Sequence, residues 1–149
     1  MNLTNKTRGR QSPLKEKKML KLDKTISITV PQFMNDGSAM RTEVFQRMDA
    51  ITKFFGGVTV TEAKGEWFSD AGIKHVDSNL IYEWNVGDVE DAALSMSHVM
   101  LGILGLLNAG EQEAVFFKLG ATAYIYENSV ENVISDQAER AIENYLGGF

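Results

Sequence analysis

The side chains best suited to chemistry lie close together in the sequence, between residues 67 and 83. An imidazole beside carboxylates can act as an acid, a base or a pH-dependent ligand contact. An indole beside them offers a flat surface on which a planar ligand can stack. The sequence therefore predicts a ligand-binding set made of Trp67, His75, Asp77, Asn79 and Glu83.

The same positions also suit a protein interface. A tryptophan supplies a large contact area when two subunits meet, and charged residues then form the rim. We take an interface as the simpler interpretation and leave open whether the chain is an enzyme. If it is one, His75 is the candidate acid or base.

Several other chemistries are excluded or disfavoured by residue types and spacing. The chain has no cysteine, which rules out disulfides, thiolate metal sites and cysteine nucleophiles. His75 and His98 are its only histidines and lack metal-ligand spacing, so neither a metal nor a cofactor is expected. We interpret His98 as a hydrogen-bonded packing residue. Gly56-Gly57 follows a predicted helix and has no phosphate-loop pattern.

The predicted ligand set shares one face only if two strands pair in a particular register. Apolar residues alternate with polar ones over residues 58–69 and 79–84, which predicts two strands. A three-residue loop that pairs Ser69 with Ile73 keeps both apolar sets on one side, with Gly72 left-handed. Trp67 then lies opposite His75. A bulge at Gly65 would reverse part of this assignment.

Parity in the same register assigns the other aromatic residues of the hairpin to the opposite face. Phe68, Tyr82 and Trp84 are expected to face the helices and pack in the core, whereas Trp67 faces away.

The remaining elements follow from periodicity and capping signals. Residues 26–30 alternate as a strand that Pro31 closes. A helix is expected from an N-cap at Ser38 to Phe55, with Gly56 in the left-handed position after it. Asp88 is the expected N-cap of the next helix. Its inner stripe is predicted to contain Val89, Ala93, Met96, Met100, Ile103 and Leu107.

The C-terminal third is predicted to contain strand and then helix. Residues 114–117 and 121–126 are either one bulged strand or a hairpin. Ser129 is the expected cap of a final helix. The order predicts an α+β fold: a ferredoxin-like βαββαβ antiparallel sheet with helices on one face, plus an appended C-terminal helix. The other face of the sheet is then open unless that helix or a second subunit covers it.

Charge divides the chain into a basic arm and an acidic body. The first 24 residues hold eight Lys/Arg and two acidic residues, a balance of +6, which leaves −11 for the rest. We predict a flexible arm over 1–23, a domain over 24–127 and a helix over 128–149 packed on the domain or on a partner. The arm could bind nucleic acid through its basic side chains, which include Lys6, Arg8, Arg10, Lys15, Lys17 and Lys18.

Two short motifs resemble those of a family of small bacterial and phage proteins without an assigned activity. The first is a Phe-x-Gly-hydrophobic-Thr … Gly-x-Trp signature, and the second a Gln-x-x-Val signature before the last strand. The matching residues are Phe55, Gly57, Val58, Thr59, Gly65, Trp67, Gly72, Gln112 and Val115. The resemblance covers residues 26–126 and implies the fold but no chemistry. Asp77-Ser78 matches the family's acidic-Ser pair only approximately.

Three functions are compatible with these features. The first is a non-enzymatic, oligomeric binding protein, such as a phage accessory protein that sequesters a small anionic or planar ligand or a host protein. The second is a cofactor-independent enzyme of the dimeric ferredoxin-like type that uses His75. The third is nucleic-acid binding through the arm. We expect a homodimer or higher oligomer in the cytoplasm of a bacterial or phage-infected cell, with no membrane association, because no apolar run is long enough to span a bilayer.

Overall fold

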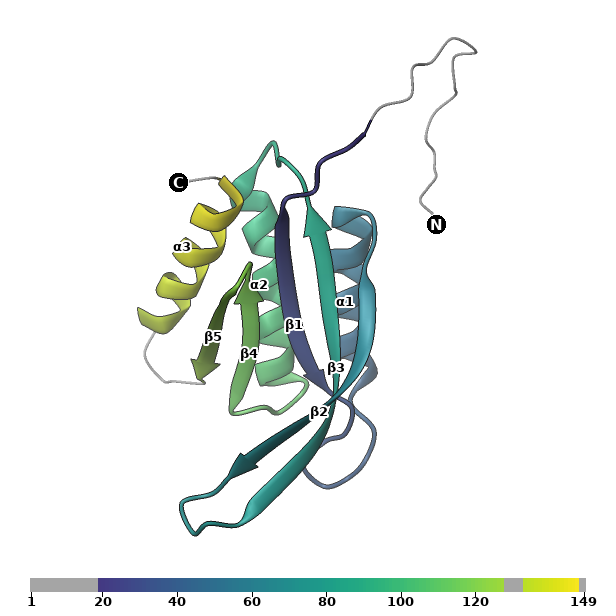
Figure 1. The fold of residues 1–149 in the computed structure, drawn as a ribbon, viewed down its shortest axis with the longest axis vertical. Helices are drawn as coiled ribbons and strands as arrows, with labels where there is room; N and C mark the ends of the chain where they lie inside the picture. The colour runs from purple at the N-terminus through teal and green to yellow at the C-terminus, as the bar shows by residue number, and fades with distance from the viewer. Residues whose placement is uncertain (1–18, 128–132, 148–149) are drawn as a thin grey trace.

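The structure of the chain is a computed structural model that describes residues 19–127 and 133–147. These residues form five strands and three helices (Figure 1). In chain order they are β1 (Lys24–Pro31), α1 (Thr42–Phe55), β2 (Thr59–Phe68), β3 (Lys74–Val86), α2 (Ala92–Asn108), β4 (Ala114–Leu119), β5 (Thr122–Glu127) and α3 (Val133–Gly147).

One antiparallel sheet organises the fold, with the strand order β2-β3-β1-β4-β5. This confirms the α+β class. The segment left open by the sequence forms two strands, β4 and β5, joined in a tight turn at Gly120, whose φ is +61°. Both α1 and α2 lie behind the sheet, and α3 packs beside α2 (Figure 1). None of the described helices covers the opposite face, which we call the open face.

The hydrophobic core lies between the sheet and its helices. Alternate residues of β1 point into it, and Ile26, Ile28 and Val30 are completely buried. Trp84 of β3 is also fully buried, and its indole Nε1 donates a 3.0 Å hydrogen bond to Thr52 Oγ1 of α1. This bond satisfies the one polar group that a buried indole carries.

Helix α1 ends as the glycine pair predicts but begins later than expected. Gly56 has a φ of +104°, and its N–H donates to Thr52 O. The Ser38 cap was wrong, because the helix starts at Thr42 with Arg41 at the N-cap position. Ser38 instead donates its backbone N–H and its hydroxyl to Asp36 within the preceding loop.

Helix α2 begins three residues later than the sequence suggested. Asp91, and not Asp88, caps it by accepting from Leu94 N at 3.0 Å. The expected inner stripe was correct except at Ala93, which is exposed: Met100, Ile103 and Leu107 are buried, and Val89 and Met96 are partly buried against the core. Because the helix is apolar on several sides, residues outside the predicted stripe are buried as well. They are Ser95, Val99, Gly102, Gly105 and Leu106.

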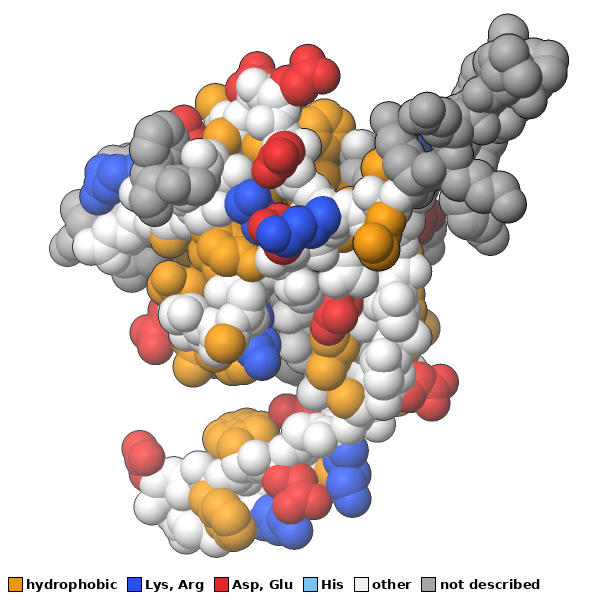
Figure 2. All heavy atoms as spheres, turned by 45° about the horizontal axis from the view of Figure 1, so that its top comes forward, with side chains coloured by type: hydrophobic (Ala, Val, Ile, Leu, Met, Phe, Trp, Pro, Cys, Tyr) orange, Lys and Arg blue, Asp and Glu red, His pale blue; other side chains and the backbone are white. Residues whose placement is uncertain are grey.

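The β2–β3 hairpin has the predicted register. Trp67 pairs with His75, and Ser69 N donates to Ile73 O across a turn in which Gly72 has a φ of +79°. Pairing continues through Gly65 without a bulge. The hairpin extends past the end of β1 and projects from the body of the molecule (Figures 1 and 2).

Phe68 was assigned wrongly to the core. Its side chain is 68% exposed, whereas Tyr82 and Trp84 are buried as expected. Parity places Phe68 on the helix side of the ribbon, but the helices do not reach that far along the hairpin.

Some sequence predictions fall outside the described residues. Lys6, Arg8, Arg10, Lys15, Lys17 and Lys18 of the basic arm lie there, as does the Ser129 cap. Nucleic-acid binding by the arm therefore stays a prediction. In the part of the chain that the structure covers, every helix is too short or too polar to cross a bilayer.

The glycine pair after α1 provides a test of the backbone. We expect Gly56→Ala to lower the free energy of unfolding by about 1 kcal/mol, because an L-residue is strained at positive φ. Gly57→Ala is the matched control, since its φ is not positive and open space surrounds its added Cβ. Urea unfolding of both variants measures the difference; equal stabilities would contradict the assigned helix end.

Candidate functional site

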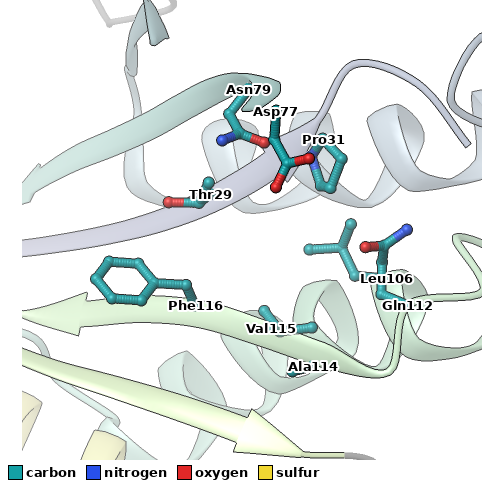
Figure 3. Close-up of a pocket in the computed structure, with 9 residues that line it drawn as sticks. All are labelled: Thr29, Pro31, Asp77, Asn79, Leu106, Gln112, Ala114, Val115 and Phe116. Carbon is teal, nitrogen blue, oxygen red and sulfur yellow. The ribbon is translucent and has the colours of Figure 1, made fainter. Parts of the chain in front are cut away.

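A pocket opens on the open face where two neighbouring strands separate. β1 pairs with β4 only from Ile26 to Ile28, although it pairs with β3 along its whole length. Beyond that point Thr29 and Pro31 lie on one side of a gap and residues 114–116 on the other (Figure 3). The gap is lined by Thr29, Pro31, Asp77, Asn79, Leu106, Gln112, Ala114, Val115 and Phe116.

The pocket is small and open to solvent. Its volume is about 200 Å³, below the roughly 300–1,000 Å³ typical of sites that enclose a drug-sized ligand. Leu106 of the buried helix α2 contributes an apolar contact, and Phe116 at one end is 42% exposed. The pocket therefore has room for part of a larger ligand, with an aromatic ring beside it.

Oxygen acceptors face the pocket from opposite sides. Gln112 donates its amide Nε2 to Gly110 O at 3.0 Å, which turns its Oε1 toward the cavity (Figure 3). Asp77 uses one carboxylate oxygen, Oδ2, to accept from Trp67 Nε1 at 3.0 Å. No side chain within the described residues bonds to its other oxygen, which can therefore accept from a ligand. Such a pair of acceptors suits a ligand group that is cationic or rich in N–H donors.

Three of the sequence-predicted residues form one connected cluster. The rings of Trp67 and His75 stack with centroids 4.2 Å apart and planes 12° apart, and Asp77 holds the indole N–H. His75 is on the projecting hairpin and does not line the pocket. Its assignment as an acid or base stays a prediction that the pocket does not support.

The other two predicted residues lie further along β3. Asn79 pairs with Pro31 of β1 and lines the pocket beside Asp77. Glu83 is exposed on the open face, between Ser27 of β1 and Thr59 of β2. The structure thus places Asp77 and Asn79 at the pocket and Glu83 outside its lining.

Sequence reasoning missed the residues that β1 and β4 contribute. Thr29 and Phe116 looked like ordinary alternating strand positions, and nothing in their spacing indicates that their strands part. Gln112 sat in a motif without an assigned role. The one signal was a large aromatic residue on the outward-facing side of an alternating strand, and its meaning depends on the sheet order.

A tight turn after α2 positions Gln112. Gln112 N donates to Leu106 O and Glu111 N donates to Asn108 O. Gly110 is required here, because a Cβ on it would lie 2.6 Å from the carbonyl oxygen of Leu106. Glu111 has a φ of +52°, a left-handed conformation that disfavours a non-glycine residue by about 1–2 kcal/mol.

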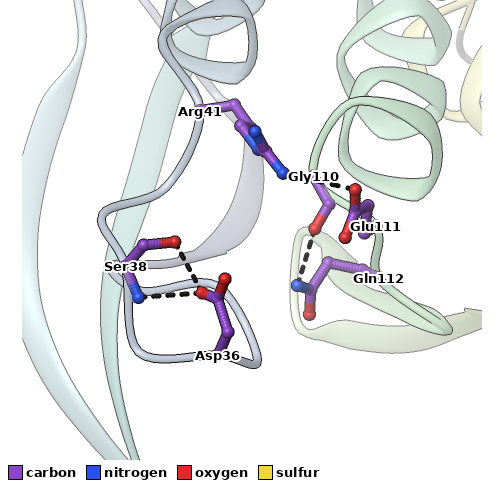
Figure 4. A network of polar contacts seen from close by, with 6 residues as sticks. All are labelled: Asp36, Ser38, Arg41, Gly110, Glu111 and Gln112. Atoms are coloured by element: carbon purple, nitrogen blue, oxygen red, sulfur yellow. Dashed lines mark hydrogen bonds and ion pairs between the residues drawn. The ribbon is translucent and has the colours of Figure 1, made fainter.

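The loop that follows β1 lies next to this turn (Figure 4). Arg41 Nη2 is 3.3 Å from Glu111 Oε2, which links the two segments by an ion pair. In the loop, hydrogen bonds from the Ser38 hydroxyl and backbone N–H lower the pKa of Asp36, and the nearby Arg41 charge adds to the effect. Arg41 is therefore ion-paired with Glu111, while the Asp36 carboxylate is held by Ser38 within the loop.

The histidine on α2 packs as expected but through a ring contact. His98 stacks on Phe54 of α1 with centroids 4.2 Å apart. Across residues 19–127 and 133–147, no three His, Asp or Glu side chains come together as metal ligands would.

Comparison with known proteins gives a match at the level of structure alone. No protein-family model and no curated protein matches the chain. Two solved structures of a phage SAM lyase are similar to it. One, in complex with S-methyl-5'-thioadenosine, has a TM-score of 0.55 at 13% identity; the other, in the apo state, has 0.56 at 14%. Each alignment covers 78% of this chain and 99% of the lyase.

This comparison corrects the first functional hypothesis. We expected a non-enzymatic binding protein, and the similar structures belong to an enzyme. The similarity extends over almost all of the lyase chain, so it concerns the whole fold and not a shared hairpin. The resemblance to a family without an assigned activity has no matching family model and stays a prediction.

The turn that carries Gln112 can be tested through Gly110. We expect Gly110→Ala to destabilise the protein by roughly 1–3 kcal/mol, because the new Cβ would press on the backbone of Leu106. Thermal unfolding measures this effect, and amide hydrogen exchange should localise faster opening to residues 109–113. A variant as stable as the wild type would show that the turn has a different shape.

Proposed function

We propose that this protein is a lyase that cleaves S-adenosylmethionine and releases S-methyl-5'-thioadenosine. The observation that carries the proposal is the similarity of fold to a phage SAM lyase along 99% of that chain. The pocket adds chemical support, because its acceptor oxygens suit a cationic substrate.

The reaction needs little beyond binding and orientation. The sulfonium of S-adenosylmethionine is a cation, so breaking its bond to the Cγ carbon leaves both electrons on sulfur and releases a neutral thioether. In a lyase no water enters the products. As this bond breaks, the four-carbon fragment either closes on its own carboxylate to form a lactone or loses a proton from Cβ to form a double bond. Neither route changes an oxidation state overall or calls for a redox cofactor.

The pocket suggests how the substrate lies. Asp77 and Gln112 would accept hydrogen bonds from the α-ammonium group, which is the part of the substrate that combines positive charge with three donors. The half-exposed ring of Phe116 would pack against the adenine.

This binding mode makes distinct predictions for substrate and product. Asp77→Asn and Gln112→Leu should each raise the KM for S-adenosylmethionine roughly ten- to a hundredfold, the effect of losing a hydrogen bond to a charged group. Inhibition by S-methyl-5'-thioadenosine should not change, because this product has no ammonium group. Mass spectrometry of the products measures turnover.

Asp49→Asn, an exposed change on α1 behind the sheet, is the matched control and should leave KM unaltered. Wild-type protein that forms no S-methyl-5'-thioadenosine would overturn the proposed function. If the variants weaken binding of S-adenosylmethionine and of S-methyl-5'-thioadenosine equally, the pocket binds the adenine and not the ammonium group.

The ferredoxin-like arrangement belongs to the same proposal. The order β2-β3-β1-β4, with antiparallel neighbours and α1 and α2 on one side, supports a split βαβ core. Strand β5 and helix α3 would then be additions at one edge.

We also propose that a second copy of the chain covers the site. A pocket of about 200 Å³ can hold only part of a nucleoside sulfonium. The projecting hairpin is apolar on both faces: Trp67 on one and Phe68 and Val76 on the other are all at least half exposed. An isolated two-stranded ribbon is only marginally stable in water, so contact with a partner would stabilise it.

The oligomer is testable by native mass spectrometry at several protein concentrations. Replacing the hairpin tip residues together, Phe68→Ser with Ile73→Ser, should dissociate the assembly. Val60→Ser, a similarly exposed apolar position in the same hairpin, should leave it intact. A wild-type protein that is monomeric throughout would contradict this proposal.

A further inference from the structure

We propose that Arg41 and Glu111 are positioning residues for the pocket, which act by fixing the turn that presents Gln112 (Figure 4). Neither residue lines the pocket or would touch the substrate. The inference rests on the proposed function, since Gln112 is assigned there to substrate binding.

The Arg41 end of the ion pair is held firmly. The loop between β1 and α1 folds back on itself through Met34 N to Ser38 O and Met40 N to Gln32 O hydrogen bonds. Met34 and Met40 are buried, which anchors both limbs of the loop to the core. Arg41 follows directly and occupies the N-cap position of α1, so its backbone has a defined place.

The Glu111 end is a residue in an unfavourable conformation. At a φ of +52° after a helix, glycine would be the relaxed choice. A glutamate at this position lowers local stability. Within residues 19–127 and 133–147, its side chain forms an ion pair with Arg41, with Nη2 and Oε2 3.3 Å apart. The contact therefore gives a reason for a side chain here that the helix end alone does not.

The turn transmits this contact to the pocket within one residue. Gln112 follows Glu111 directly and is held at two points, by its backbone N–H on Leu106 O and by its side-chain amide on Gly110 O. A shift of the turn would move both anchors together. The Oε1 atom would then no longer face Asp77 across the cavity.

A purely stabilising ion pair is a weaker explanation. The side chains of Arg41 and Glu111 are 50% and 66% exposed, and ion pairs at such sites contribute little to stability. A pair that holds two loops in register needs only to restrict their relative movement, which exposure does not prevent.

The variant Glu111→Gly distinguishes a positioning role from a stabilising role, because the two predict opposite changes in melting temperature. If the pair positions the turn, the variant should melt at the same or a higher temperature, because strain is relieved, while the KM for S-adenosylmethionine rises about three- to tenfold. The kcat should stay within about twofold, because the variant weakens binding of the ground state and of the transition state equally. A lower melting temperature with an unchanged KM would overturn the proposal.

A double-mutant cycle tests whether the two residues act as a pair. Arg41→Gln and Glu111→Gln should each raise KM, and the double variant should be no worse than either single variant. Arg41→Lys, which keeps the charge, should recover part of the loss. Glu113→Gln is the matched control in the same turn and should behave as wild type; additive effects in the cycle would overturn the proposal.

Hydrogen exchange at the Gln112 amide tests the role of the ion pair independently of any enzymatic activity. If wild-type protein does not cleave S-adenosylmethionine, the proposed function fails and the role of the ion pair is decided by the Gln112 amide. That amide should exchange faster in Arg41→Gln than in wild type or Glu113→Gln. Unchanged exchange would show that the ion pair does not hold the turn.

Discussion

The pairing of β1 with β4 stops after three residue pairs, and the candidate site depends on this constraint. Along β3 the same strand is paired over all eight of its residues, so its course is fixed. Strand β4 must therefore diverge from it, and the sheet opens on one side only. Because α2 lies behind the opening, the gap has an apolar base and becomes a pocket and not a hole through the sheet.

The polar residues of this pocket are placed by elements that cannot easily move. Asn79 stands where β3 is paired on both sides, and Asp77 lies two residues further, at the base of the projecting hairpin. Gln112 follows a turn in which Gly110 is packed against the backbone of α2. The site is thus supported by strand β3 and by the turn after α2, and Glu111, whose backbone is strained, directly precedes Gln112 in that turn. Strain concentrated beside a pocket is typical of positions kept for function.

Local patterns in the sequence were sufficient for the hairpin and insufficient for the pocket. Parity and the Gly72 turn gave the pairing of Trp67 with His75, because register is a local property. Parity says which side of a ribbon a residue occupies but not whether a helix covers it, which is why Phe68 was misplaced. The gap between Thr29 and Phe116 arises from strands more than eighty residues apart, and no local pattern records it.

The openness of the site bears directly on the chemistry proposed for it. A lyase must keep water away from the electrophilic carbon while the sulfonium departs, since water would otherwise take the place of the internal nucleophile. A pocket of about 200 Å³ that is open to solvent cannot exclude water from that carbon alone. Neither the exposed apolar hairpin nor the open face is covered by any element that the structure describes. Burying one against the other in a second copy would exclude water from the substrate. The same association would strengthen the acceptor pair of Asp77 and Gln112, because a hydrogen bond to a cation gains strength as the surrounding dielectric falls. Assembly and chemistry would therefore depend on each other in this fold.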